Sequence, residues 1–176
     1  MPCTLISSGR ALPCKNSVGG LKSVYFASYG TLGDVTIVGG EITAVAGTPD
    51  FYKYDIKGNS SLETAITSSR ENGTTFYTQT LNLTLTTLDK GTQEEIKLLA
   101  ASRPHVAIED YNGNFFMVGL EHGAEVTGGT IVSGAAMGDL SGFTLTLEGM
   151  ETSPANFTVS TVVTANESSS QIDPNA

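Results

Sequence analysis

Two cysteines and two histidines are the residues of this chain that could ligate a transition metal: Cys3, Cys14, His105 and His122. Thiolate and imidazole groups are the usual protein ligands of zinc. The cysteines, however, lie eleven positions apart and lack the CxxC spacing that marks a structural zinc site. We therefore predict no metal site, and we interpret the cysteines as unpaired thiols of an N-terminal arm.

The stretch from Asp110 to Asn114 carries oxygen ligands at the spacing with which a calcium loop begins. A calcium loop needs Gly at its sixth position and Glu at its twelfth, and here Phe115 and a Gly-rich stretch stand in their place. The Asn112-Gly113 pair predicts a hairpin turn instead. His105 has no motif-bearing nucleophile beside it, and the phosphate-loop, dinucleotide, zinc-protease and hydrolase motifs are absent. We expect no enzyme activity and no cofactor.

The carboxylates are the remaining chemical feature. Residues 1–103 hold nine basic and nine acidic side chains, whereas residues 104–176 hold nine acidic and no basic ones, so the second part carries all of the net charge of −9. Proteins that bind nucleic acid neutralise phosphates with Lys and Arg, so a surface built from this part would repel DNA. The alternative interpretation is that these carboxylates are scattered, solvated side chains that aid solubility.

The composition predicts a mainly β domain. Only 15% of the residues are charged and the chain is rich in Thr, Ser and Gly rather than in helix formers. We expect an irregular arm at 1–20, a single β-rich domain at 21–164 and a disordered polar tail at 165–176. The N-terminus lacks the apolar core of a signal peptide and no apolar run could span a bilayer, so we expect synthesis in the cytoplasm and no membrane partner.

The clearest predicted element is a long hairpin at residues 61–84. With Asn72-Gly73 as a two-residue turn, Glu71 faces Thr74 and Leu62 faces Leu83. One face of this hairpin is then mostly apolar and the other is rich in hydroxyl groups. Shorter strands precede it at four places, namely 21–27, 34–38, 41–46 and 49–57.

The remaining chain predicts one helix and a second hairpin. Residues 88–103 form the helix, with Thr92 as N-cap and Glu95 as its capping-box partner. In the hairpin that follows, Ile108 faces Met117, and large apolar groups on both faces indicate a sheet covered on both sides. The remaining predictions are a segment too rich in Gly for one continuous strand at 121–142, and strands at 143–149 and 157–163.

Two stretches resemble the tail tube proteins of long-tailed bacteriophages. They are SGRALPCKNSVGGLKSVYF (8–26) and the run from HVAIEDYNGNFFMVGLEHG (105–123) through SGAAMGDLSGFTLTLEGMETSPANF (133–157). The resemblance implies a β-sandwich or partial barrel with a flanking helix. It further implies that six copies form a ring whose hairpins join into an inner β-barrel, with each hairpin adding two strands. Stacked rings then form a tube that conducts the genome.

The resemblance also implies functional residues. The candidates for the wall of the channel are acidic or hydroxyl-bearing, namely Glu63, Thr67, Thr78, Thr80, Glu121, Glu125, Asp139, Glu148 and Glu151. Contacts between subunits or rings are expected from the arm and from the Tyr-bearing segment 49–60, with Leu12, Val18, Phe51, Tyr52 and Tyr54 as the candidates. An acidic wall would let DNA pass without tight binding.

The implied partners are further copies of this chain and other tail proteins: the sheath if the tail contracts, the baseplate, the terminator and the tape measure. The implied location is the tail of the virion, after assembly in the host cytoplasm. Two alternatives stay open. One is a soluble β-sandwich recognition or adhesin module, with residues 121–142 as its site and Tyr52, Tyr54 and Tyr77 as its exposed aromatics. The other is a different tail component, such as a terminator or baseplate hub.

Overall fold

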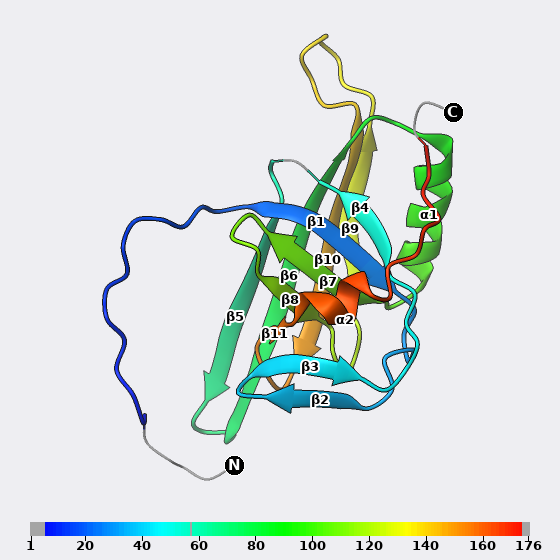
Figure 1. Cartoon of the computed structure of the whole chain (residues 1–176). Helices are drawn as coiled ribbons and strands as arrows, with labels where there is room; N and C mark the ends of the chain where they lie inside the picture. The colour runs from blue at the N-terminus through cyan, green and yellow to red at the C-terminus, as the bar shows by residue number, and fades with distance from the viewer. Residues whose placement is uncertain (1–5, 57, 174–176) are drawn as a thin grey trace.

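Two mainly antiparallel sheets pack face to face in the computed structural model (Figure 1). The structure describes residues 6–56 and 58–173. The larger sheet has seven strands. In spatial order they are β2 (Val35–Val38), β3 (Glu41–Val45), β11 (Asn156–Thr158), β8 (Phe115–Val118), β7 (His105–Asp110), β1 (Leu21–Ala27) and β4 (Tyr52–Asp55). The expected mainly β sandwich with a flanking helix is therefore confirmed. None of the described helices is long and apolar enough to cross a membrane.

The smaller sheet has four strands, all antiparallel to their neighbours. Their spatial order is β5 (Ser61–Ser69), β6 (Thr74–Thr86), β10 (Gly142–Glu151) and β9 (Glu125–Val132). The turn between β5 and β6 and the loop between β9 and β10 lie at opposite ends of this sheet (Figure 1). The segment at 121–142 is not one continuous strand, as predicted, but its glycines do not prevent Glu125–Val132 from forming β9. Pairing with β10 along its whole length stabilises β9.

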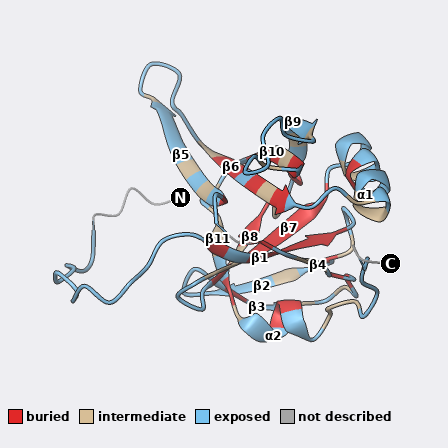
Figure 2. Ribbon diagram, turned by 90° about the horizontal axis from the view of Figure 1, so that it is seen from above, coloured by how far each residue is buried: buried red, intermediate tan, exposed pale blue. Residues whose placement is uncertain are grey.

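The main core lies between the two sheets. Alternate residues of the small sheet point inward, among them Leu81, Leu83, Leu145 and Leu147, each at most 5% exposed. A second buried cluster covers the opposite face of the large sheet, where α2 (Ser160–Thr164) lies. Figure 2 accordingly shows consecutive buried residues along β1 and β7, and since neighbouring residues of a strand point to opposite faces, both faces of these strands are covered. The expectation that the strands at 105–120 are covered on both sides is confirmed.

The helix α1 (Lys90–Ala101) flanks the sandwich beside β9 and buries Ile96. Its N-cap is Asp89, whose carboxylate accepts a hydrogen bond from the Thr92 N–H at 2.8 Å. The prediction of Thr92 as N-cap was wrong, because the Asp three residues earlier offers the stronger, charged acceptor. At the other end of the chain, α2 replaces most of the strand predicted at 157–163, and only Asn156–Thr158 pairs as β11.

Both hairpins exist, but their registers differ from those predicted. Leu62 faces Leu81, not Leu83, because residues 70–73 form a four-residue loop. A type I′ turn needs positive φ at both central residues, and here Gly73 alone has it, at 63°. A shift of two residues leaves every side chain on its predicted face.

The second hairpin is shifted by one residue, so that Ile108 faces Phe116 instead of Met117. Its loop has three residues and ends on Gly113 with φ of 81°, as in a type I turn followed by a bulge. The two hairpins also lie in different sheets. The expectation that both hairpins contribute strands to one inner barrel was therefore wrong. The first hairpin shares its sheet with β9 and β10, whereas the second lies in the large sheet and is covered on both sides.

Candidate functional site

The outer face of the four-stranded sheet is the most distinctive surface of the molecule. Its strands alternate, so the residues between the buried leucines point away from the core. The outward residues are mostly exposed or half-buried, and none of the described helices or strands lies over this face (Figure 2). The four strands contain neither Lys nor Arg, and their outward positions are mainly Thr, Ser, Asn and Glu.

Three carboxylates of this outer face lie in a single transverse row. Glu63 of β5 pairs with Thr80 of β6, Thr80 pairs with Glu148 of β10, and Glu148 pairs with Glu125 of β9. We call these four residues the acidic row. Side chains directly opposite each other on antiparallel strands have their Cβ atoms about 5 Å apart, and like charges in that position are destabilising. The row is thus a feature that folding alone does not favour.

Hydroxyl groups surround the acidic row. Thr130 and Thr144 lie 2.6 Å apart through their Oγ1 atoms, and the Thr146 hydroxyl donates to Asn82 Oδ1 at 3.0 Å. These bonds link polar groups of neighbouring strands without adding fixed charge. Phe76 and Met150 are the large exposed apolar side chains on the outer face.

Six of the nine predicted wall residues lie on this face. They are Glu63, Thr67, Thr78, Thr80, Glu125 and Glu148. Of the other three, Glu121 is exposed in the turn between β8 and β9, and Asp139 is exposed in the loop between β9 and β10. The pKa of Asp139 is lowered by hydrogen bonds from the Ala136 and Ala135 N–H groups, so this carboxylate organises its own loop.

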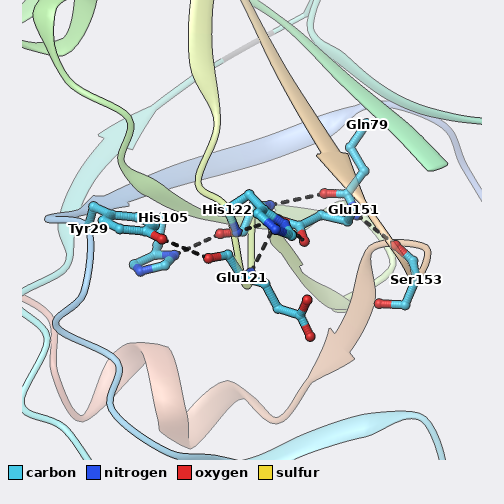
Figure 3. Close-up of polar contacts among 8 residues, drawn as sticks. Tyr29, Gln79, His105, Glu121, His122, Glu151 and Ser153 are labelled. Carbon is cyan, nitrogen blue, oxygen red and sulfur yellow. Dashed lines mark hydrogen bonds and ion pairs between the residues drawn. The ribbon is translucent and has the colours of Figure 1, made fainter. Parts of the chain in front are cut away.

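Glu151 is not on the outer face, which removes it from the predicted wall. Its side chain is 2% exposed, and Oε1 accepts hydrogen bonds from the backbone N–H groups of Glu121 at 3.2 Å and His122 at 2.9 Å (Figure 3). Its Oε2 lies 2.9 Å from His122 Nδ1. In the strand Gly142–Glu151, Glu151 shares the inward parity of Leu145 and Leu147, and this parity is the signal that could have identified it.

Gln79 is a second buried anchor that the sequence analysis missed. Its Oε1 accepts a hydrogen bond from the Gly119 N–H at 3.0 Å and its Nε2 donates to the Ser153 carbonyl at 3.2 Å (Figure 3). It also shares the inward parity of its neighbours Leu81 and Leu83. Gln79 and Glu151 together fasten the turn between β8 and β9 to the end of the small sheet.

His105 joins the same turn to the chain at 28–33. Its Nδ1 donates to the Gly119 carbonyl at 2.7 Å and its Nε2 accepts from the Gly30 N–H at 3.0 Å, so the ring is neutral. Burial is the main cause that lowers its pKa. The Tyr29 ring stacks on it at 5.1 Å, and Arg103 covers Tyr29 at 4.1 Å. Both ring nitrogens are occupied by structural bonds, which leaves none for general base catalysis or for a metal.

One group of side chains within the described residues has metal-ligand spacing. Ligand atoms of Glu121, His122 and Glu151 lie within 4.8 Å of one another. The Glu151 carboxylate already holds the turn and His122, so its bonds have a structural explanation. Cys14 is exposed on the arm and takes no part in this group, and Cys3 lies outside the described residues. Within the described residues, neither Cys14 nor His105 belongs to a group with metal-ligand spacing.

The predicted contact residues fall into two groups. Leu12 and Val18 are 97% and 59% exposed on the arm of residues 6–20, which leaves the body in Figure 1, and Tyr52 is 43% exposed. Tyr54 is half-buried against Phe26, and burial, then Glu95, raises its pKa to about 12.

Phe51 was a wrong choice for a contact, because its side chain is fully buried in the second core cluster. Its backbone pairs with residues 166 and 168, so part of the predicted disordered tail is held against the body. Residues 174–176 of that tail lie outside the described residues.

Comparison of the chain with family models, with curated proteins and with solved structures finds no match.

Proposed function

We propose that this protein is a structural subunit of a bacteriophage tail tube, in which rings of about six copies stack around a channel for genome DNA. One observation carries the proposal. It is a four-stranded sheet without Lys or Arg, whose uncovered outer face bears a row of three carboxylates and whose two edges are both open. The resemblance of residues 8–26, 105–123 and 133–157 to tail tube proteins supports the same function.

The strand order of the small sheet supports ring closure. The edge strands β5 and β9 run antiparallel to each other, because three antiparallel pairings separate them. Copies related by rotation about an axis along the sheet can therefore pair β9 of one copy with β5 of the next in an antiparallel ladder. Such a head-to-tail contact closes into a ring when the rotation is a whole fraction of a turn. Closure removes the open edges of all copies.

The dimensions of such a ring suit a DNA channel. About six copies would supply about 24 strands, and strands about 4.8 Å apart and tilted by about 40° would close a barrel about 48 Å across the backbone. Side chains on the inside narrow this to about 35 Å, which admits a DNA duplex. In this arrangement the outer face of the free subunit becomes the lining of the channel, and the apolar face packs on the large sheet.

The acidic row gives the lining its mechanism. In a ring it becomes a continuous band of carboxylates, and DNA carries a negative charge every ~1.7 Å along its axis. Repulsion acts within about 8 Å at physiological salt, so it keeps the duplex away from the wall. The hydroxyl groups around the row offer hydrogen bonds to water and hold no countercharge to which phosphates could bind. The other tail proteins would meet the ends and the outside of such a tube.

Negative-stain electron microscopy of the purified protein across a concentration series tests the proposal. Rings with a central hole, or tubes of uniform width, are expected. Uniform small particles at every concentration would refute it and favour the recognition module. Single rings that never extend would indicate a tail terminator instead.

A DNA-binding measurement tests the lining separately. The wild-type assembly should show no salt-dependent binding of a duplex. A variant with Glu63, Glu125 and Glu148 changed to Lys should bind duplex DNA, and its affinity should fall steeply with salt because phosphate contacts release counterions. A matched variant with Glu41, Glu94 and Glu95 changed to Lys has the same net charge but a different location, and it should bind less tightly. Equal binding by the two variants would contradict a role for the acidic row.

A further inference from the structure

The two open edges of the small sheet lack several features that normally prevent pairing. Proteins protect edge strands with Lys, Pro, short length or β-bulges, and of these features only a single bulge, in β9, is present. The edge strand β5 has nine residues and β9 has eight, and neither contains Lys or Pro. Each also exposes one large apolar side chain on the inward face, since Ile66 of β5 is 69% exposed and Ile131 of β9 is 54% exposed. Both edges therefore present backbone and apolar groups that their own chain leaves uncovered.

An apolar groove lies beside the β9 edge. It has a volume of about 260 Å³ and runs between α1 and the inward face of β9 and β10, with Ile96, Val126, Ile131 and Phe143 in its walls. Between Val126 and Ile131, Gly128 and Gly129 leave the middle of its β9 side without large side chains. A strand added to β9 would place its own inward side chains against this groove.

Two requirements restrict how β5 of another copy can pair with β9: the inward faces of the two strands must match, and like charges must not meet. Inward residues must meet inward residues, because a shift of one position would turn the apolar groups toward the channel. Without any offset the acidic row continues straight across the junction. Glu125 then faces Glu63 of the next copy, which sets like charges opposite each other, and β9 runs past the start of β5 at Ser61.

An offset of four residues removes both conflicts. We infer that β9 of one copy pairs with β5 of the next so that Glu125 faces Thr67, Val126 faces Ile66 and Ile131 faces Leu62. This register counts the bulge of β9 between Val126 and Gly128 as one position. It joins apolar groups on the inward side and places each carboxylate opposite a Thr. The neighbour's Ile66 then lies at the groove beside α1, and the two edges overlap over almost their whole length.

The same offset agrees with barrel geometry. An offset of about four residues per copy, summed over about six copies and about 24 strands, corresponds to a strand tilt of about 35°. Closed barrels have tilts of about 35–45°. The inference rests on the proposed ring assembly and adds the register, which ring formation alone does not determine.

Disulfide trapping tests the register. In a chain with Cys3 and Cys14 changed to Ser, the pair Thr67→Cys with Glu125→Cys is compared with the pair Glu63→Cys with Glu125→Cys. Positions on β5 and β9 of one chain are separated by three strand spacings, about 14 Å, so a bond between them must join two copies. Under mild oxidation the Thr67 pair should form covalent dimers and higher ladders at least about tenfold faster than the Glu63 pair.

The outcomes separate this inference from the proposed function. Faster cross-linking of the Glu63 pair, or no cross-linking of either pair in preparations that show rings by electron microscopy, overturns the register and leaves the ring intact. Absence of rings in the wild-type protein overturns both. Hydrogen exchange on wild-type protein provides a measurement independent of variants: amides of 61–67 and 125–132 should become protected on assembly. Unchanged exchange at both edges in assembled rings would also overturn the inference.

Discussion

Replacing Glu148 with Gln should stabilise the free subunit. Glu148 faces Glu125 directly and is separated from Glu63 by one strand. Two unit charges about 6 Å apart in water repel by about 0.7 kcal/mol, and screening at 0.15 M salt about halves this value. The more distant Glu63, about 10 Å away, adds about 0.1 kcal/mol. The sum is about 0.5 kcal/mol, which raises the melting temperature of a domain of this size by about 1–2 °C.

Thermal unfolding followed by circular dichroism, at low and high salt and at a concentration where the protein is monomeric, measures this effect. The matched control is Glu63→Gln, which removes the same charge from a position whose directly paired neighbour is Thr80. Glu148→Gln should gain more stability than Glu63→Gln. The difference should shrink at about 1 M salt, because charges farther apart than about 3 Å are then largely screened from each other. A loss of stability in Glu148→Gln, or a difference that salt does not change, would refute the reasoning about the acidic row.

Three further perturbations test other parts of the structure. The pKa of His105 in the folded protein lies below its ordinary value of 6.5, so the unfolded chain binds the proton more tightly. The contribution of neutral His105 to stability should therefore be complete above pH 6.5 and decline as the pH falls below it. Urea denaturation should accordingly show a weaker pH dependence of stability for His105→Gln than for the wild type. Ile66→Ser should change the stability of the free subunit by less than about 0.5 kcal/mol yet raise the concentration needed for assembly by about tenfold or more in a sedimentation assay, whereas Leu98→Ser, at a similarly exposed position on α1, should not affect assembly. Gln79→Leu should lower the free energy of unfolding by about 1–3 kcal/mol in a denaturant titration, because the buried Gly119 N–H loses its acceptor, and an unchanged value would show that water replaces the amide.

Alternation along the strands was the most reliable information in the sequence. In the first hairpin it placed Glu63 and Thr80 on the same hydroxyl-rich face, and the two-residue error in register did not disturb this assignment. The same parity places Gln79 and Glu151 on the inward face of the small sheet. Their anchoring role was missed because their partners are backbone groups about 30 or more residues away along the chain, which the sequence does not bring together.

Turn lengths and short elements could not be obtained in the same way. An Asn-Gly pair fits two-, three- and four-residue loops, and the φ angles that distinguish them depend on strand pairings across the sheet. The helix Ser160–Thr164 consists largely of β-branched residues, whose local preference is for strand. Its conformation follows from the burial of Val162 and Val163, of which Val163 belongs to the second core cluster. The pairing of β9 with β10 likewise outweighs the glycines within β9.

The side chain of Asn112 fixes the point from which the N-terminal arm can swing. Its amide donates to the Val18 carbonyl at 2.8 Å and its Oδ1 accepts from the Val18 N–H at 3.0 Å. The flexible pair Gly19-Gly20 lies between this clamp and β1, so it cannot serve as the hinge. The arm therefore departs from the body at Val18, and residues 6–17, fully extended, would span about 40 Å from this point. A single hairpin turn thus sets the origin of the surface that the described part of the arm can reach.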